Sequence, residues 1–166
     1  MRSVRQIGVT LLAVVALLSA GNAAAAATPL PQWATHQIVA RHSGHCLTGF
    51  IPKGSQARTA ACGTEVDQRW ALYPTYPASQ WYYVRTVAYD TCLDVEGAAL
   101  DNWAHVNHQP CGYAGTNRHW RLVLTDGGYY ELINRWSNRC LDISWGWAVQ
   151  YDCNNGYHQQ FRFRPN

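Results

Sequence analysis

The sequence carries one pattern three times, and this internal repeat restricts the possible folds more than any other feature. In each copy a cysteine is followed by leucine, and two positions before it stands a residue that tolerates a tight turn. A second cysteine follows, and a large aromatic residue comes eight or nine positions later. The first cysteines are Cys46, Cys92 and Cys140, the turn residues Gly44, Asp90 and Asn138, the second cysteines Cys62, Cys111 and Cys153, and the aromatics Trp70, Trp120 and Phe161. Three copies of one small unit favour a fold with threefold pseudosymmetry.

Polar and apolar residues alternate around each of the three aromatics, in segments 69–72, 119–122 and 160–163. A period of two is typical of half-buried strands. No window after residue 27 shows a convincing amphipathic helix, so the sequence predicts an all-β domain over 35–166, with repeats at about 35–77, 78–127 and 128–166. Closing three such units into a barrel hides the sheet edges that would otherwise invite aggregation.

All six cysteines lie inside the repeats, and an even number in an exported chain indicates disulfides. Zinc is the alternative, but zinc sites normally use closely spaced pairs, and no C-x-x-C pair occurs. Six cysteines allow 15 connectivities in principle. Pairing within each repeat is the simplest, and it predicts the disulfides Cys46–Cys62, Cys92–Cys111 and Cys140–Cys153.

The N-terminal segment has the order of a secretory signal, with Arg2 and Arg5 first, an apolar run over 7–18, and small residues through Ala27. The alternative is an N-terminal membrane anchor, but an apolar run of 12 residues is too short to span a bilayer as a helix. We therefore expect a signal peptide at 1–27, a short extension at 28–34, and a secreted, extracellular domain that does not insert into membranes. Without the signal, Lys plus Arg falls from 13 to 11 against 10 acidic residues, which argues against nucleic-acid binding.

The repeats resemble the ricin B-type lectin family. The resemblance rests on Cys92-Leu93-Asp94 and Cys140-Leu141-Asp142 early in two repeats, and on a closing Gln-x-aromatic motif. That motif reads Gln68-Arg69-Trp70 in the first repeat and Gln159-Gln160-Phe161 in the third, whereas the second has Arg118-His119-Trp120. The resemblance implies a β-trefoil that binds galactose-type or xylan-type sugars in shallow pockets, one for each competent repeat. It also implies that the closing glutamines and aromatics are structural.

The third repeat fits the family's sugar site best. Sugar binding needs a carboxylate for ring hydroxyls, an aromatic face for the C–H face of the pyranose, and a further polar side chain. In the family these are the Asp two residues after the first cysteine, an aromatic two before the second, and usually an Asn before the closing Gln. The corresponding residues here are Asp142, Tyr151 and His158, with Gln150 beside the tyrosine. Trp145 and Trp147 are additional stacking candidates, and the alternative for both is a packing role in the core. His158 replaces the usual Asn, and the short segment before Cys153 would displace Gln150 from the family's amide position.

The other two repeats match the site less completely. The second has Asp94 and Asn117, but Gln109 stands at the aromatic position, so a stacking residue would have to come from Trp103, His105 or His108. His105 and His108 could also suggest a metal site, but we expect solvated loop histidines, because no third ligand is evident. The first repeat has Thr48 and Ala60 at the two key positions and is expected to be structural only.

Two other functions compete with sugar binding. A glycosidase would need two carboxylates about 5–10 Å apart, whereas Asp94 and Asp142 belong to equivalent places of different repeats. No nucleophile elbow, zinc-protease or phosphate-loop motif occurs, so we expect neither an enzyme nor a cofactor or metal. The second competitor is a protein-binding trefoil, such as a protease inhibitor or the receptor-targeting subunit of a toxin, because one fold serves many functions.

Overall fold

The computed structural model describes residues 34–49, 52–112 and 114–166. This part of the chain contains twelve β-strands and five single-turn 3₁₀ segments, and it contains no α-helix. The strands are β1 (Thr35–Ala40), β2 (Cys46–Thr48), β3 (Arg58–Ala60), β4 (Trp70–Pro74), β5 (Tyr82–Thr86), β6 (Thr91–Val95), β7 (Val106–Pro110), β8 (His119–Leu124), β9 (Tyr130–Asn134), β10 (Cys140–Ser144), β11 (Trp147–Tyr151) and β12 (Phe161–Pro165). The 3₁₀ segments are η1 (Val66–Gln68), η2 (Glu96–Ala98), η3 (Thr116–Arg118), η4 (Asp126–Gly128) and η5 (Tyr157–Gln159).

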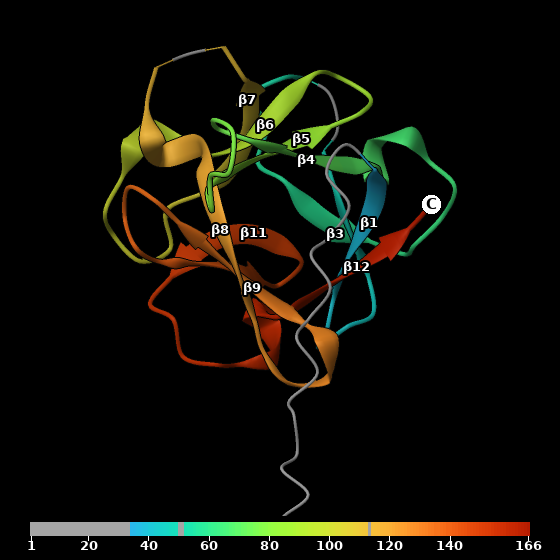
Figure 1. Cartoon of the computed structure of the whole chain (residues 1–166). Coiled ribbons are helices and arrows are strands. Elements are labelled where there is room, and N and C mark those ends of the chain that lie inside the picture. Colours follow the sequence, from blue (N-terminus) through green and yellow to red (C-terminus); the bar gives the residue numbers. More distant parts are fainter. Residues whose placement is uncertain (1–33, 50–51, 113) are drawn as a thin grey trace, which may run out of the picture.

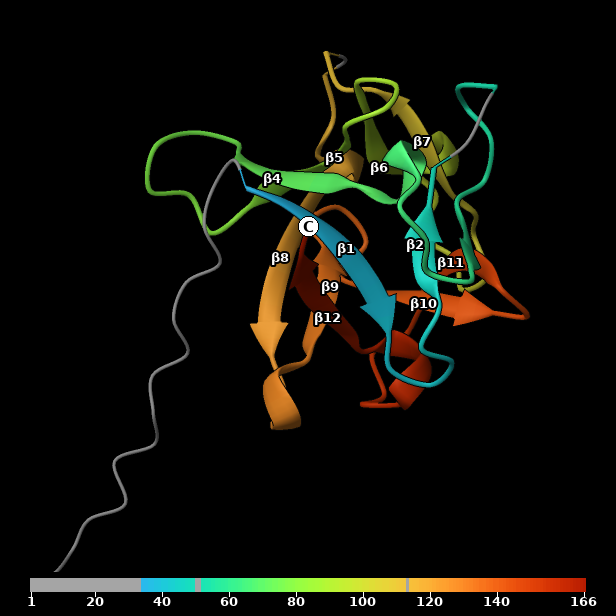
Figure 2. The ribbon, with the colours of Figure 1, turned by 90° about the vertical axis from the view of Figure 1, so that its right-hand side faces the viewer.

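Six of the strands form a closed antiparallel barrel. The pairing runs β1–β4, β4–β5, β5–β8, β8–β9, β9–β12 and back from β12 to β1. The first and last strands of the domain therefore lie side by side, as Figures 1 and 2 show for β1 and β12. Closure gives every barrel strand two neighbours and removes the free sheet edge.

The remaining strands form three hairpins, β2–β3, β6–β7 and β10–β11. In each repeat the hairpin lies in the sequence between the first and the last strand, which both belong to the barrel. This arrangement of a six-stranded barrel and three hairpins is a β-trefoil, and the expected all-β fold is confirmed. The hairpins also contact one another, since β11 pairs with β3 at Trp147 and Arg58, and single bridges join Gln56 to Asn107 and His105 to Val149. The three predicted disulfides, each within one repeat, are present.

The turn before each first cysteine adopts the backbone conformation that the sequence predicted. Gly44, Asp90 and Asn138 all have positive φ, at 69°, 55° and 57°. Glycine, aspartate and asparagine are the residues that reach this left-handed region at least cost. The three equivalent turns therefore follow from local chemistry alone.

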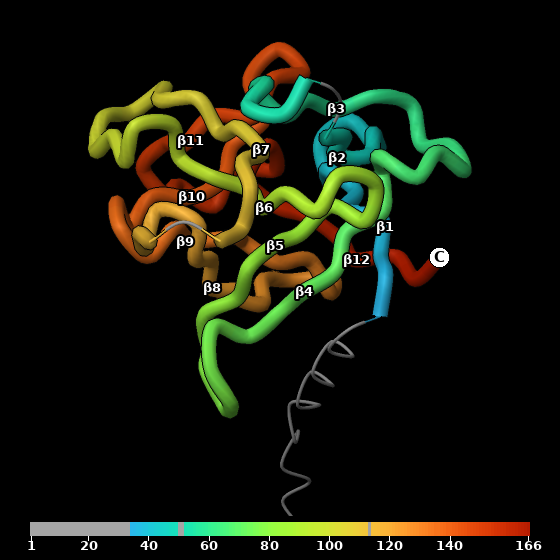
Figure 3. The backbone as a smooth tube through the Cα atoms, turned by 90° about the horizontal axis from the view of Figure 1, so that it is seen from above, coloured from blue at the N-terminus to red at the C-terminus, as the bar shows by residue number. Residues whose placement is uncertain are grey.

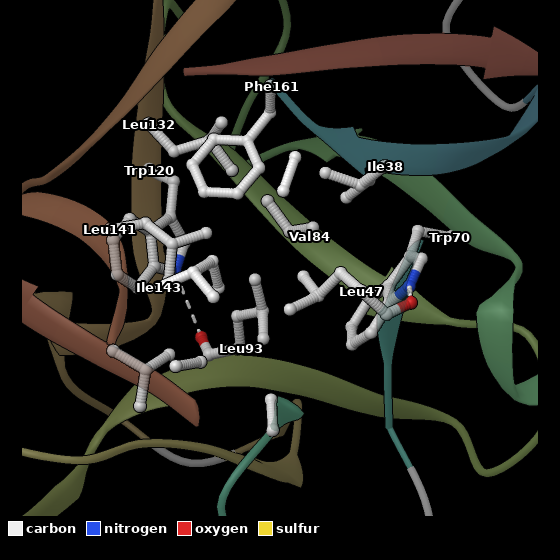
Figure 4. Close-up of a cluster of buried hydrophobic side chains, with 14 of the residues drawn as sticks. Ile38, Leu47, Trp70, Val84, Leu93, Trp120, Leu132, Leu141, Ile143 and Phe161 are labelled. Atoms are coloured by element: carbon white, nitrogen blue, oxygen red, sulfur yellow. Dashed lines mark hydrogen bonds between the residues drawn. The ribbon is translucent and has the colours of Figure 1, made fainter. Parts of the chain in front are cut away.

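The core is formed by the inner side chains of the barrel and by side chains of the three hairpins, and the three repeats contribute equivalent residues (Figure 4). Trp70, Trp120 and Phe161 are almost wholly buried there, as expected for the closing aromatics. The Trp70 indole N–H donates to the Leu47 carbonyl at 2.9 Å, and that of Trp120 donates to the Leu93 carbonyl at 3.0 Å. Each indole thus fills the core and also ties the barrel to the leucine beside a first cysteine.

We expect Trp120→Ala to lower the free energy of unfolding by about 3–5 kcal/mol, because it leaves a cavity in a fully buried position. Trp120→Phe keeps most of the ring but leaves the Leu93 carbonyl without its partner, so it should cost only about 1–3 kcal/mol. The third repeat already uses Phe161 at the equivalent position. Denaturant unfolding followed by fluorescence or circular dichroism measures both variants. Equal losses for the two would contradict a cavity as the main cause.

The disulfides are in keeping with an oxidising, extracellular environment. The expected signal peptide, 1–27, lies outside the described residues, as does the extension 28–34 apart from Ala34. Within the described ranges, no helix has the length and apolar character needed to cross a bilayer.

Candidate functional site

The β10–β11 hairpin carries most of the residues that the sequence singled out. Its register pairs Cys140 with Tyr151, Asp142 with Val149 and Ser144 with Trp147. Side chains of directly paired residues lie on the same face, and successive residues alternate between faces. Asp142, Tyr151 and Trp147 therefore share one face of the hairpin, with the carboxylate between the two aromatics along the strands.

Asp142 is a nearly buried carboxylate, only 3% exposed. Its Oδ2 accepts a hydrogen bond from Gln159 Nε2 at 2.9 Å and lies 3.3 Å from His158 Nε2. Both partners come from η5, the 3₁₀ turn that precedes the closing Phe161. Burial raises the pKa of Asp142, while the Gln159 hydrogen bond and the nearby His158 and His42 act in the opposite direction. The carboxylate is thus fixed in place, and its charged form depends on these neighbours.

The predicted aromatic residues differ greatly in exposure. Tyr151 is half-buried, and its ring centroid lies 4.7 Å from that of Trp103, with the ring planes tilted by 59°. Trp147 is partly exposed, and Trp145 at the hairpin tip is 98% exposed. Trp145 and Gly146 both have positive φ, which gives the two-residue loop the geometry of a tight β-hairpin turn. The hairpin therefore presents aromatic faces at both ends of the Asp142 position.

Gln150 does not join this face, although the sequence placed it in the candidate site. Its side chain is fully buried. Nε2 donates to the carbonyls of Ala99 and Asp101 at 3.0 and 2.9 Å, and Oε1 accepts from Ser137 Oγ at 2.6 Å. Because Gln150 precedes Tyr151 in a strand, strand alternation turns it to the opposite side. We therefore leave Gln150 out of the proposed contacts.

The second repeat also holds its carboxylate, but with a different partner. Arg118, which stands in place of the closing glutamine, brings Nε within 2.6 Å of Asp94 Oδ2, and Asn117 Nδ2 donates to the same oxygen at 3.1 Å. Burial raises the pKa of Asp94 to about 6, although Arg118 and the Asn117 hydrogen bond favour its charged form. Asp94 and Asn117 thus lie together as the sequence suggested. However, Asn117 bonds to Asp94 itself, and Asp94 is also paired with Arg118.

The three stacking candidates for the second repeat, Trp103, His105 and His108, contact residues other than Asp94. Trp103 leans on Tyr151 of the third repeat, and His105 lies 3.3 Å from Glu96. His108 is fully buried, with Nδ1 3.0 Å from Thr91 Oγ1. The expectation of a solvated loop histidine therefore fits the exposed His105 but was wrong for His108, which belongs to β7. No group of three or more potential metal ligands occurs among the residues that the structure describes.

The first repeat has no carboxylate at the equivalent position. Thr48 is buried, and its hydroxyl donates to the Cys46 carbonyl at 3.3 Å. Gln68 instead serves the backbone, accepting from Gly63 N–H at 2.8 Å and donating to the Ala61 carbonyl at 2.9 Å. Gln159 makes the same kind of bonds in the third repeat, to Asn154 and Asp152. The expected structural role of the closing glutamines is confirmed.

Two features of the site were not foreseen from the sequence. Gln159 bonds directly to Asp142 as well as to the backbone, and its place in the repeat, next to His158, was a signal that could have indicated this contact. Trp103 lies against Tyr151 although 48 positions separate them in the chain. No local pattern marks that second contact, because it arises between repeats.

Comparisons with known proteins agree with the β-trefoil fold. The family described as Ricin-type beta-trefoil lectin domain-like matches residues 31–109, 66–148 and 116–166. A designed 3-fold symmetric protein, ThreeFoil, is 30% identical, with a TM-score of 0.72 over 80% of this chain and 99% of that chain. A search of curated protein sequences finds no match.

Two natural proteins share the fold at lower identity. An exo-beta-1,3-galactanase from Clostridium thermocellum is 19% identical, with a TM-score of 0.72 over 82% of this chain and 31% of that chain. A Polyporus squamosus lectin, solved with a human-type influenza-binding epitope, is 15% identical, with a TM-score of 0.72 over 82% of this chain and 50% of that chain. This chain therefore corresponds to about a third of the galactanase and half of that lectin.

Proposed function

Because the chain belongs to the Ricin-type beta-trefoil lectin domain-like family, we propose that it binds carbohydrate, chiefly through the third repeat, and that it does so without catalysis. One observation carries the proposal. Asp142, a fixed carboxylate, lies between Tyr151 and Trp147 on a single hairpin face. A carboxylate beside aromatic rings is the combination that a pyranose needs, because it offers both hydroxyls and an apolar C–H face.

Each side chain has a distinct task in this proposal. Gln159 and His158 hold Asp142 Oδ2, while Oδ1 makes no hydrogen bond to another described residue and is the oxygen for sugar hydroxyls. Tyr151 or Trp147 stacks on the sugar ring, and His158, more exposed than Asp142, adds a polar contact at the rim. Trp145, at the tip, is available to a larger ligand. The preferred sugars are of the galactose or xylan type, as the family resemblance implies.

The second repeat is proposed as a weaker site or none. Arg118 Nε lies 2.6 Å from Asp94 Oδ2, and Asn117 donates a hydrogen bond to the same oxygen. Gln109 pairs with Cys92 at the position where the third repeat has Tyr151 opposite Cys140. A sugar hydroxyl would have to compete with a charged guanidinium for the same oxygen. This difference supports one principal site for each chain, so high avidity would require several copies on one surface.

The same two carboxylates are placed unsuitably for glycoside hydrolysis. A glycosidase places two carboxyl groups about 5–10 Å apart around one bond. Asp94 and Asp142 lie in different hairpins of the trefoil, and each is bonded within its own repeat. Pure protein incubated with polysaccharide should release no sugar, and measurable release would overturn this part of the proposal.

A glycan array probed with the oxidised protein tests the proposed function. We expect binding to galactosides or to xylan fragments. A folded protein that binds nothing on the array, checked by circular dichroism, would refute carbohydrate binding. That result would favour the alternative function, a trefoil that binds another protein.

Acidification should weaken sugar binding at a pH above the ordinary aspartate pKa of 3.8, because burial raises the pKa of Asp142. A protonated carboxyl loses the charge-assisted hydrogen bonds to sugar hydroxyls, so affinity falls as the pH drops through the raised pKa. Positive charge on the neighbouring His158 and His42 lowers the pKa of Asp142 and limits how far burial raises it. Titration calorimetry between pH 7 and pH 4 measures the effect, with circular dichroism as the folding control. Constant affinity down to the ordinary value would contradict the assigned role of Asp142.

A further inference from the structure

The connection between β6 and β7, which belongs to the second repeat, lies against β11 of the third (Figure 3). Trp103 N–H donates to the Gln150 carbonyl, and Gln150 N–H donates to the Ala104 carbonyl, both at 2.9 Å. A single bridge between His105 and Val149 continues this pairing. The segment thus lies alongside the strand that carries Tyr151 and Trp147, as an additional strand would.

The buried Gln150 side chain forms hydrogen bonds to the backbone of this connection. Its amide donates to the Ala99 and Asp101 carbonyls, and Ser137 bonds to its oxygen. Buried amides with several good hydrogen bonds fix the backbone that they contact. Gln150 is therefore a positioning residue for the loop 99–103 and makes no sugar contact itself.

Asn102 fixes the same loop from the outside. Its Oδ1 accepts from Asp152 N–H at 2.9 Å and from Arg139 Nε at 2.6 Å, and its Nδ2 donates to Asp152 Oδ2 at 2.9 Å. Arg139 also lies 3.2 Å from Asp152 Oδ1. These bonds join the second repeat to the segment just after Tyr151. The residue that follows Asn102, Trp103, is thereby held in one position.

Trp103 has a costly backbone conformation and an exposed ring. Its φ is +69°, in the left-handed region that costs a non-glycine residue about 1–2 kcal/mol. The side chain is nevertheless 57% exposed, so it recovers only part of the burial that a core tryptophan gains. Its described ring contact is with Tyr151. Neither turn chemistry nor core packing accounts for a tryptophan at this position.

We propose that Trp103 forms a second sugar subsite beside Tyr151, so that the third repeat binds a chain of at least two linked pyranose units. This inference rests on the proposed function and extends it. Neighbouring strands are about 4.8 Å apart, so the Trp103 segment lies about two strand spacings, roughly 10 Å, from β10 and Asp142. The ring planes of Trp103 and Tyr151 are tilted by 59°, so they cannot stack together on one flat ring. Each offers a face to a different sugar of the chain.

The ligand class follows from these contacts. A linear oligosaccharide places one sugar at Asp142 and the next toward Trp103. Asn102, which precedes Trp103 in the chain, and its partners Asp152 and Arg139 provide polar groups on this segment. A single sugar occupies only the Asp142 subsite. Affinity should therefore increase with chain length from one to two or three units.

The test compares chain lengths in Trp103→Asn, which removes the ring and keeps a residue that tolerates positive φ. The probes are the mono-, di- and trisaccharide of the sugar that the array selects, measured by titration calorimetry. We expect about tenfold weaker binding of the di- and trisaccharide and no change for the monosaccharide. The matched control is Tyr76→Asn, because Tyr76 is also 57% exposed but lies on the β4–β5 connection, away from β10 and β11 (Figure 2). Its affinities should equal those of the wild type.

The outcomes separate the two proposals. If the wild type binds sugar and Trp103→Asn shows the same dependence on chain length, the subsite is refuted and the proposed function stands. If the wild type binds no sugar of any length, the proposed function itself fails. If Trp103→Asn weakens the monosaccharide as much as the trisaccharide, the two-subsite arrangement is overturned. Thermal unfolding of the variant should be unchanged or slightly higher, because asparagine relieves the backbone strain, so a loss of folding does not explain the expected result.

Discussion

Reducing all three disulfides should unfold this domain at physiological temperature. The bonds close loops with sequence separations of 16, 19 and 13 residues. In the chain-entropy model each loop of this size stabilises the folded state by about 3 kcal/mol, or about 9 kcal/mol for three independent bonds. The whole stability of a typical domain is about 5–15 kcal/mol. Thermal unfolding with and without a phosphine reductant measures the difference.

The disulfides can also be removed one at a time. Replacing both members of Cys140–Cys153 with serine should lower the free energy of unfolding by about 3 kcal/mol and leave the other two bonds intact. The equivalent double variant of Cys46–Cys62 is the control, because it lies in the repeat without a proposed site. The two variants should lose similar stability, but only the first should also weaken sugar binding. For the fully reduced protein, an unchanged unfolding midpoint would contradict the first prediction. It would show that the barrel core keeps the domain folded without disulfides.

Replacing Asp142 with asparagine should weaken sugar binding by about ten- to a hundredfold. The substitution keeps the shape of the side chain and an oxygen for Gln159, but it removes the charge that strengthens hydrogen bonds to hydroxyls. Such charge-assisted bonds contribute about 1.5–3 kcal/mol. Titration calorimetry with the best array ligand measures the loss.

The equivalent positions of the other repeats provide the matched controls. Asp94→Asn should have a smaller effect, since Arg118 already occupies that carboxylate, and Thr48→Ala should have none. The alanine series Asp142→Ala, Asp94→Ala and Thr48→Ala should rank in the same order. Equal losses at all three positions would refute the assignment of the main site to the third repeat.

The sequence was sufficient for features that depend on short-range chemistry. Gly44, Asp90 and Asn138 indicated left-handed turns because few residue types adopt that conformation cheaply. The period-two pattern around Trp70, Trp120 and Phe161 placed these rings in a core. The threefold spacing of the cysteines selected the pairing within repeats. In each case the signal lies within one repeat and is reinforced by two further copies.

Gln150 is a residue that the sequence placed in the candidate site but that the structure places on the opposite, buried face. The residue is polar and stands beside Tyr151, which suggested a sugar contact. Its direction depends on the strand register, which pairs it with Leu141 on the buried face. The same alternation that put Asp142 and Tyr151 together therefore excludes Gln150. A strand bounded at Trp147–Tyr151 would have given this answer from the sequence.

Contacts between elements that are distant in the sequence were decided only by the tertiary structure. Arg118 could be identified as a substitution in the closing motif, but its bond to Asp94 depends on how η3 packs on β6. Trp103 meets Tyr151 because the trefoil places the β6–β7 connection beside β11. Sequence periodicity describes one strand or one repeat at a time, whereas barrel closure determines which repeats become neighbours. The sequence by itself thus determined the fold and the disulfides and indicated Asp142 as the candidate carboxylate. The closed barrel decided that a residue of another repeat, Trp103, lies beside Tyr151.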